Sequence, residues 1–151
     1  MSNADLRPTL ITGTQIWASS ESVAHACLIS DPFVRSVVCL RRTLPDWWIA
    51  LRDELKNKIA FHHLPTPDIF DGDMGEAIVR VVFDLLPKLE APVLVFCLRG
   101  RNRTGVFAGY LRFQVTRDVG AAVLEYRRRA SLGYRKEEVA LLRSLCCLRH
   151  Q

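Results

Sequence analysis

The sequence lacks long apolar runs, paired-cysteine motifs and a recognisable leader, and each absence excludes a class of protein. No apolar stretch approaches the roughly 20 residues that a membrane-spanning helix requires. The first ten residues, MSNADLRPTL, have no positive segment followed by an apolar one, so we expect no secretory signal. There is no C-x2-C pair and the four histidines lack metal-ligand spacing, so we expect neither a zinc site nor any other metal or cofactor.

The cysteine count is odd, which does not suit a disulfide framework. The five cysteines are Cys27, Cys39, Cys97, Cys146 and Cys147. Without a leader, unpaired thiols are typical of a reducing compartment, so we expect a cytoplasmic protein. The 151 residues suffice for one core, and no repeat, linker or low-complexity segment divides them, so we predict a single domain over residues 1–151.

Basic residues give the chain a formal net charge of +5, which indicates either an anionic partner or a solvated basic surface. Most of the excess lies in two clusters, residues 99–103 and 127–136. The run Arg127–Arg129 falls on a predicted helix, where a solvated face is a more common explanation than a nucleic-acid track. We therefore do not expect nucleic acid as the partner, and the sequence leaves the oligomeric state open.

Strand and helix patterns alternate through the first two-thirds of the chain, which predicts an α/β domain with a mainly parallel central sheet of four to five strands flanked by helices. The runs that predict strands are 10–19, interrupted by Gly13, and 34–40, 59–64 and 92–97. The predicted helices are 19–30, 44–57, 74–89, 103–116, 118–131 and 136–149, of which the last three form a C-terminal helical segment. Ligands of such sheets bind at the carboxyl ends of the strands.

One of these strand ends, VLVFCLRGRNRTG at residues 93–105, carries the strongest functional signal. Cys97 ends a strand with no polar face, and Arg99, Arg101 and Arg103 follow within a few positions. Cations this close repel one another unless an anion binds them. The backbone N–H groups of a loop that enters a helix point at one spot and favour an anion there. We therefore predict a site for a phosphorylated anion, with Arg103 binding two of its oxygens.

The same positive field acts on the Cys97 sulfur. Helix N-termini and nearby cations favour the ionised form of a cysteine, so we expect a thiolate at neutral pH. It would lie under the phosphorus of the bound anion, ready for in-line attack and a phosphocysteine intermediate. The Thr104 hydroxyl is placed to hydrogen-bond this sulfur and help it leave in the second step. A buried, inert cysteine is the simpler interpretation, but it does not explain the arginines that follow.

The pattern Cys97-x5-Arg103-Thr104-Gly105, between an apolar strand and a helix, resembles the signature loop of the cysteine-dependent protein tyrosine phosphatase superfamily. The short chain resembles its dual-specificity branch. The resemblance covers about residues 59–115 and implies a metal-independent phosphatase with Cys97 as nucleophile and Arg103 as the transition-state residue. It also implies a phosphate cradle made by Leu98, Arg99, Gly100, Arg101 and Asn102. The implied substrates are phosphotyrosine or phosphoserine proteins, inositol phosphates and phosphoinositides.

Two details of the loop bear on substrate and on activity. Arg-Gly-basic-x-Arg-Thr-Gly resembles an atypical plant and fungal group that acts on inositol pyrophosphates, and a basic residue at Arg101 is also found in lipid phosphatases of the superfamily. Phe96 departs from the family pattern, which usually has His before the cysteine, so a hydrogen bond that orders the loop is missing. This departure leaves a phosphate-binding module without turnover as an alternative. RNA 5′-triphosphatases of the same superfamily and a sulfurtransferase are further alternatives.

A general acid must protonate the leaving oxygen, and the predicted loop 65–73 supplies three aspartates. We predict Asp68, which follows Pro67, because the dual-specificity phosphatases that the chain resembles often carry their acid after a proline. Asp71 is the second candidate, although Asp-Gly also favours a plain turn. Asp73 is the third, because the spacing to the next helix predicts it as the helix cap.

Overall fold

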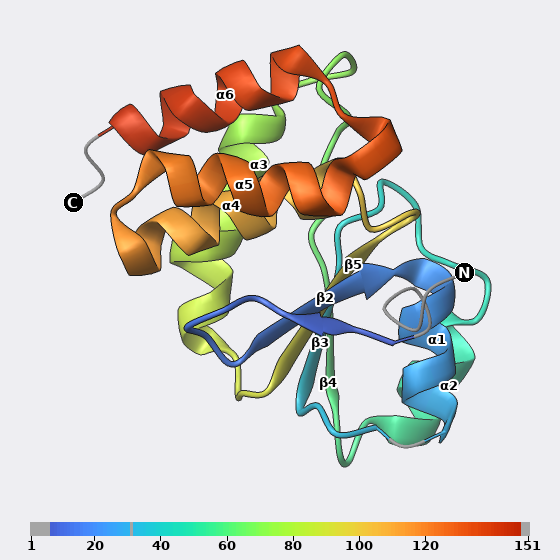
Figure 1. Ribbon diagram of the computed structural model, residues 1–151. Coiled ribbons are helices and arrows are strands. Elements are labelled where there is room, and N and C mark those ends of the chain that lie inside the picture. The colour runs from blue at the N-terminus through green and yellow to red at the C-terminus, as the bar shows by residue number, and fades with distance from the viewer. Residues whose placement is uncertain (1–6, 31, 149–151) are drawn as a thin grey trace.

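A five-stranded sheet forms the centre of the computed structural model, which describes residues 7–30 and 32–148 (Figure 1). The strand order is β1-β2-β5-β3-β4, with β1 antiparallel to β2 and the other four parallel to one another. The bounds are Thr9–Leu10 (β1), Ile16–Ser20 (β2), Ser36–Cys39 (β3), Ala60–His63 (β4) and Val93–Cys97 (β5). The predicted mainly parallel sheet is therefore confirmed.

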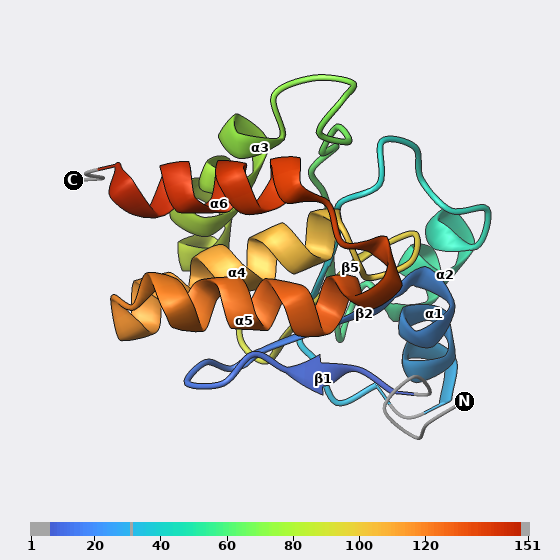
Figure 2. The same cartoon turned by 45° about the horizontal axis from the view of Figure 1, so that its top comes forward.

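Helices cover both faces of the sheet (Figures 1 and 2). One face packs against α1 (Glu21–Ser30) and α2 (Trp48–Leu55). The other packs against α3 (Met74–Arg80), α4 (Arg103–Thr116), α5 (Val119–Ala130) and α6 (Lys136–Cys147). This is the fold class that the alternation of strand and helix patterns predicts.

Strand β5 is buried on both faces, which explains its lack of polar residues. Val93, Val95 and Cys97 belong to the core beneath α3–α6, whereas Leu94 and Phe96 belong to the core beneath α1 and α2. Because side chains alternate along a strand, this register places the Cys97 side chain on the α4 side of the sheet.

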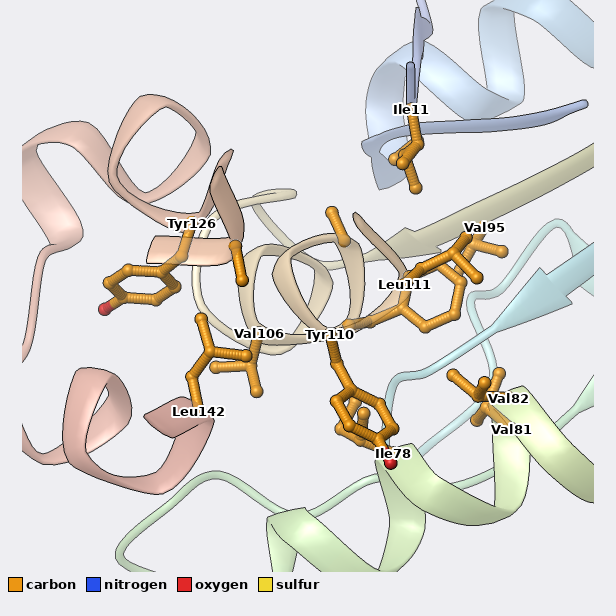
Figure 3. Close-up of a cluster of buried hydrophobic side chains, with 14 of the residues drawn as sticks. Ile11, Ile78, Val81, Val82, Val95, Val106, Tyr110, Leu111, Tyr126 and Leu142 are labelled. Atoms are coloured by element: carbon orange, nitrogen blue, oxygen red, sulfur yellow. The ribbon is translucent and has the colours of Figure 1, made fainter. Parts of the chain in front are cut away.

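Helix α4 is the centre of the larger core. Figure 3 shows Leu142 of α6 against Val106 of α4, and Ile78 of α3 against Tyr110 of α4. All residues from 104 to 111 are buried, so the helix that follows the Cys97 loop is held on several sides. This packing keeps the start of α4 in place relative to the sheet edge.

The predicted helix 74–89 is interrupted, which the apolar periodicity did not indicate. After α3 the chain widens into a π-helical turn, η2 (Val81–Leu85), and then a 3₁₀ turn, η3 (Leu86–Lys88). Pro87 accounts for the change, because proline has no N–H to donate and its ring clashes with the carbonyl four residues earlier.

Two other predicted helices also differ at their ends. The predicted helix 44–57 begins only at Trp48, after a turn in which the Trp48 N–H donates to the Pro45 carbonyl at 3.1 Å. The last predicted helix ends at Cys147, and its predicted end at residue 149 lies outside the described residues. Residues 1–6, on which the expectation about a secretory signal rests, lie outside them as well. No helix in the described ranges has the length and apolar character to cross a membrane.

Candidate active site

Loops at the carboxyl ends of the parallel strands enclose a cavity of about 420 Å³. This is the edge of the sheet at which ligands of such folds bind. Nine residues line the cavity: Arg42, Asp68, Asp71, Cys97, Leu98, Arg99, Asn102, Arg103 and Arg135. The structure thus brings the predicted nucleophile, the predicted phosphate-binding arginine and the predicted acid to one cavity, although they come from separate segments.

The loop after Cys97 lies directly on the end of β2. Gly100 has a φ of +70°, and a Cβ there would come within 2.6 Å of the Ser19 carbonyl carbon and the Ser20 nitrogen. Only glycine combines this conformation with this approach. The Leu98 carbonyl accepts from the Glu21 N–H at 3.2 Å, which holds the start of the loop to α1. The loop is therefore shaped by contacts with its neighbours.

The backbone N–H groups of the loop are available for an anion. Within the described part of the chain, no N–H of residues 99–102 donates to another protein group. Helix α4 begins at Arg103, so its first N–H groups also lack partners within the helix and add the positive end of its dipole. Together these donors could hold an oxyanion beside Cys97.

Thr104 lies beneath this surface and does not line the cavity. It is fully buried, and its Oγ1 has no hydrogen-bond partner among the described residues. The expected bond to the Cys97 sulfur is thus not formed in this structure. Burying a hydroxyl group without a hydrogen-bond partner costs free energy. Thr104 thus has an unused hydrogen-bond donor in the first turn of α4, despite this cost.

The arginines of the loop face two different sides. Arg99 and Arg103 line the cavity together with Leu98 and Asn102. Arg101 and Gly100 do not, and instead line a second hollow on the other side of the loop. The cradle predicted from Leu98 to Asn102 therefore lies between two hollows rather than facing only one.

Asp68 lines the cavity and forms an ion pair there with Arg135. Its Oδ1 and Oδ2 accept from Arg135 Nη1 at 2.7 and 2.9 Å. Burial lowers the pKa of Arg135, but the bonds to Asp68 outweigh this and hold the pKa above its usual value. Figure 2 shows the loop before α3 beside the start of α6, which is where this ion pair forms.

The other two candidate aspartates have different contacts. Asp71 also lines the cavity, and its Oδ2 lies 3.8 Å from Arg42 Nη1. Asp73 caps α3, because its Oδ1 accepts from the Glu76 N–H at 2.9 Å, which confirms the predicted cap. Asp68 and Asp71 thus remain the candidates in the cavity, and Asp73 has a structural use.

A buried carboxylate links the loop after Cys97 to the loop that carries Asp68. Glu138 of α6 is fully buried, and its Oε1 accepts from Asn102 Nδ2 at 2.8 Å and from the Tyr126 hydroxyl at 2.5 Å. Its Oε2 lies 3.9 Å from Arg135 Nη1. Burial raises the pKa of Glu138, although these partners oppose the shift. Asn102 and Arg135 are therefore fixed through one shared side chain.

Phe96, which stands where the resembled family usually has His, is fully buried among aromatic rings. Its ring centroid lies 5.7 Å from that of Trp47 and 6.1 Å from that of Trp48. The hydrogen bond that a histidine would supply is absent here. The Asn102–Glu138 bond and the contact of Gly100 with β2 are other constraints that can order the loop.

Sequence reasoning missed Arg42 and Arg135 as site residues. Arg42 closely follows β3, and a charged residue after a strand in a parallel sheet is a signal that could have found it. Arg135 belongs to the second basic cluster and precedes α6, and nothing near it in the sequence indicates that it faces Cys97. Among the described residues, no three His, Cys, Asp or Glu side chains gather as metal ligands would.

Comparison with known proteins finds similarity in structure but not in sequence. No family model and no curated protein matches the sequence. The core catalytic domain of the PP-IP phosphatase Siw14 from S. cerevisiae superposes with a TM-score of 0.73 at 21% identity, covering 90% of this chain and 83% of that one. The Yvh1 phosphatase domain from Chaetomium thermophilum gives 0.65 at 14%, covering 91% and 94%. The Cydia pomonella PTP-2 phosphatase gives 0.62 at 15%, covering 92% and 89%.

These three proteins belong to the cysteine-dependent protein tyrosine phosphatase superfamily. The chain has their fold over about nine-tenths of its length, with a mainly parallel sheet between two layers of helices. At these identities the likeness concerns the fold, and function must be argued from the site itself.

Proposed function

We propose that this protein is a cysteine-dependent phosphatase that hydrolyses phosphate esters or anhydrides through a phosphocysteine intermediate. The observation that carries the proposal is the shared cavity of Cys97 and Arg103, with Arg42, Arg99 and Arg135 around it. Four guanidinium groups beside one thiol at a helix N-terminus suit a phosphoryl dianion and the charge that builds up on it during transfer.

The reaction takes place in two steps. The Cys97 thiolate attacks phosphorus in line, the sulfur–phosphorus bond forms, and the bond to the leaving oxygen breaks as Asp68 supplies its proton. Water then attacks the phosphocysteine, the Asp68 carboxylate takes the water proton, and phosphate leaves as the thiolate is restored. Arg103 and the loop N–H groups bind the equatorial oxygens in both steps.

Asp68 must leave its ion pair before it can act as an acid. Both oxygens of its carboxyl group accept from Arg135, at 2.7 and 2.9 Å, so neither is free to meet the leaving oxygen of a substrate. An anionic substrate offers the Arg135 guanidinium another partner, so its entry draws Arg135 away from the Asp68 carboxyl group. Because Glu138 lies 3.9 Å from Arg135, that arginine keeps a second acidic neighbour when Asp68 moves away.

The lining of the cavity favours a small polyanionic substrate over a phosphotyrosine side chain. Four of the nine lining residues are arginines, and none of the nine, all in the described part of the chain, is aromatic. A phenyl ring is normally held by apolar or aromatic walls, whereas several phosphates need cations. Inositol phosphates and phosphoinositides are therefore the substrate class that we propose, and Siw14, a PP-IP phosphatase, has the same fold.

A substrate panel tests this proposal. We expect the highest kcat/KM on inositol phosphates or phosphoinositide headgroups, lower values on phosphopeptides and on triphosphorylated RNA, and none in Cys97→Ser, which serves as the blank. Phosphate release is the readout. Preference for phosphopeptides would contradict the substrate class. Release that persists in the blank would contradict the mechanism.

Asp68→Asn is expected to depend on the leaving group. An alkyl phosphate needs protonation of its leaving oxygen, so its kcat/KM should fall by about a hundredfold or more. p-Nitrophenyl phosphate has a leaving group that departs unprotonated, so its loss should be small. The ratio of the two rates is the measurement, and Asp71→Asn is the matched control because Asp71 lines the same cavity. If Asp71→Asn changes the ratio and Asp68→Asn does not, Asp71 is the acid.

A further inference from the structure

A second hollow, the basic groove, lies on the other side of the Cys97 loop. It has a volume of about 720 Å³ and is lined by the loop, the end of β2, the start of α1 and residues of α5. Leu98 and Arg99 line both the basic groove and the cavity, so the two hollows meet at these residues. Ser20 pairs with Cys97 in the sheet register, which places the end of β2 directly beside the nucleophile.

Positive charge and hydroxyl groups dominate the basic groove. Five of its fourteen lining residues are arginines and five carry hydroxyl groups, and none of these described residues is acidic. Arg129 is already engaged, because its Nε donates to Glu125 at 2.8 Å and its Nη1 donates to Thr9 at 2.9 Å. The arginines that remain for a ligand are Arg7, Arg99, Arg101 and Arg128.

The three consecutive arginines of α5 have three different environments. Arg129 is nearly buried and ties α5 to β1 through Thr9. Arg128 lines the basic groove with 64% of its side chain exposed. Among the described residues one carboxylate, that of Glu125 at 4.0 Å, lies within ion-pair distance of it, and Arg129 binds this carboxylate more closely. Arg127 lies outside the groove, with its guanidinium 5.2 Å from the centre of the Tyr134 ring. The run is therefore not a uniform solvated face.

Three of these four arginines, Arg7, Arg99 and Arg101, lack compensating charge. In the described ranges, no carboxylate lies within ion-pair distance of Arg7, Arg99 or Arg101. Guanidinium groups gathered in one concave surface attract an anion, and a phosphate group matches the fork of an arginine with two oxygens. The hydroxyl groups of Ser20 and Ser22, 3.3 Å apart at the start of α1, add neutral donors at one end of the groove.

We propose that the basic groove binds a second phosphate group of a ligand that carries several phosphates, while another of its phosphates lies above Cys97. The proposal rests on the proposed function, because it takes the Cys97 cavity as the place of the phosphate to be cleaved. Arg99 joins the two subsites. A monophosphate occupies only the cavity, so the groove selects for polyphosphorylated ligands rather than for phosphate as such.

Competitive inhibition of p-nitrophenyl phosphate turnover tests this inference. Arg7→Ser and Arg128→Ser should each weaken inhibition by inositol hexakisphosphate by about tenfold, the effect of one charge-assisted contact. Inhibition by orthophosphate should not change, because it reaches only the cavity. Arg127→Ser is the matched control, since it removes the same charge one residue away and outside the groove. Equal weakening in Arg127→Ser, or none in Arg128→Ser, would overturn the proposal.

Calorimetry on Cys97→Ser separates this proposal from the proposed function. If the wild type does not turn over an aryl phosphate but inositol hexakisphosphate binding still depends on Arg128, the phosphatase proposal fails and the groove is supported.

Sedimentation with phosphatidylcholine vesicles, with and without phosphatidylinositol bisphosphate, distinguishes a lipid headgroup from a soluble ligand. Binding to the bisphosphate vesicles that depends on Arg128 supports the groove with a membrane source. If the wild type does turn over the aryl phosphate, and Arg128→Ser weakens inhibition by orthophosphate as much as inhibition by inositol hexakisphosphate, the groove proposal is overturned.

Discussion

Cys97→Ser is expected to lower kcat for p-nitrophenyl phosphate by about ten-thousandfold or more, because it removes the nucleophile. A serine hydroxyl stays protonated at neutral pH and forms no comparable intermediate. The arginines and N–H groups around the sulfur are unchanged, so orthophosphate should bind about as well as it does to the wild type. Steady-state kinetics and isothermal calorimetry measure the two effects separately.

The control for this prediction is the same substitution at another thiol. Cys147 is exposed in the last turn of α6 and lines neither hollow, so Cys147→Ser should leave turnover unchanged. Near-normal turnover by Cys97→Ser would refute the phosphocysteine mechanism. Loss of both turnover and phosphate binding would instead show that the variant has lost the shape of its loop.

Arg103→Lys is expected to lower kcat/KM for the same substrate by about a hundredfold to a thousandfold. The positive charge is retained, but an ammonium group cannot bind two equatorial oxygens in the plane of a guanidinium fork. The loss should appear mainly in kcat, because the fork matches the transition state better than the bound substrate. Measurement of kcat and KM at saturating and limiting substrate separates these two contributions.

Arg112→Lys provides the matched control on the same helix. Arg112 lies nine residues further along α4, where its Nη1 donates to the Thr12 carbonyl at 2.9 Å, and it lines neither hollow. Its exchange for lysine should have little effect on kcat/KM. If Arg103→Lys costs no more than Arg112→Lys, Arg103 does not bind the phosphoryl group, and the assignment of the site is wrong.

The elements of the fold could be predicted closely because their signals are local. Strand β5 is apolar along its whole length, and the acidic cap Asp73 marks the start of α3. Prediction failed where one residue overrides a pattern. Pro87 interrupts an otherwise regular helical periodicity, and the chain there forms a π-helical turn and then a 3₁₀ turn instead of continuing as an α-helix.

The candidate site was predictable only in part, for a related reason. Cys97, Arg103 and the loop between them share one short segment, so their spacing already indicates an anion site. Asp68 was inferred from a different loop through the resemblance, and its role stays a prediction. Its ion pair with Arg135 could not be foreseen, because the two residues lie far apart in the sequence and only the packing of α6 beside the loop before α3 brings them together.

The sequence by itself determined the chemistry that one strand, loop and helix can hold: a cysteine at a strand end, a glycine that lets the loop lie on β2, and an arginine in the first turn of α4. Only the tertiary structure decided which further charges face that chemistry. Arg42 comes from beyond β3, Arg135 from the start of α6, and Arg128 from α5. The physical reason is that charges act through space, and the distances between these groups are set by the strand order and by helix packing, not by separation along the chain.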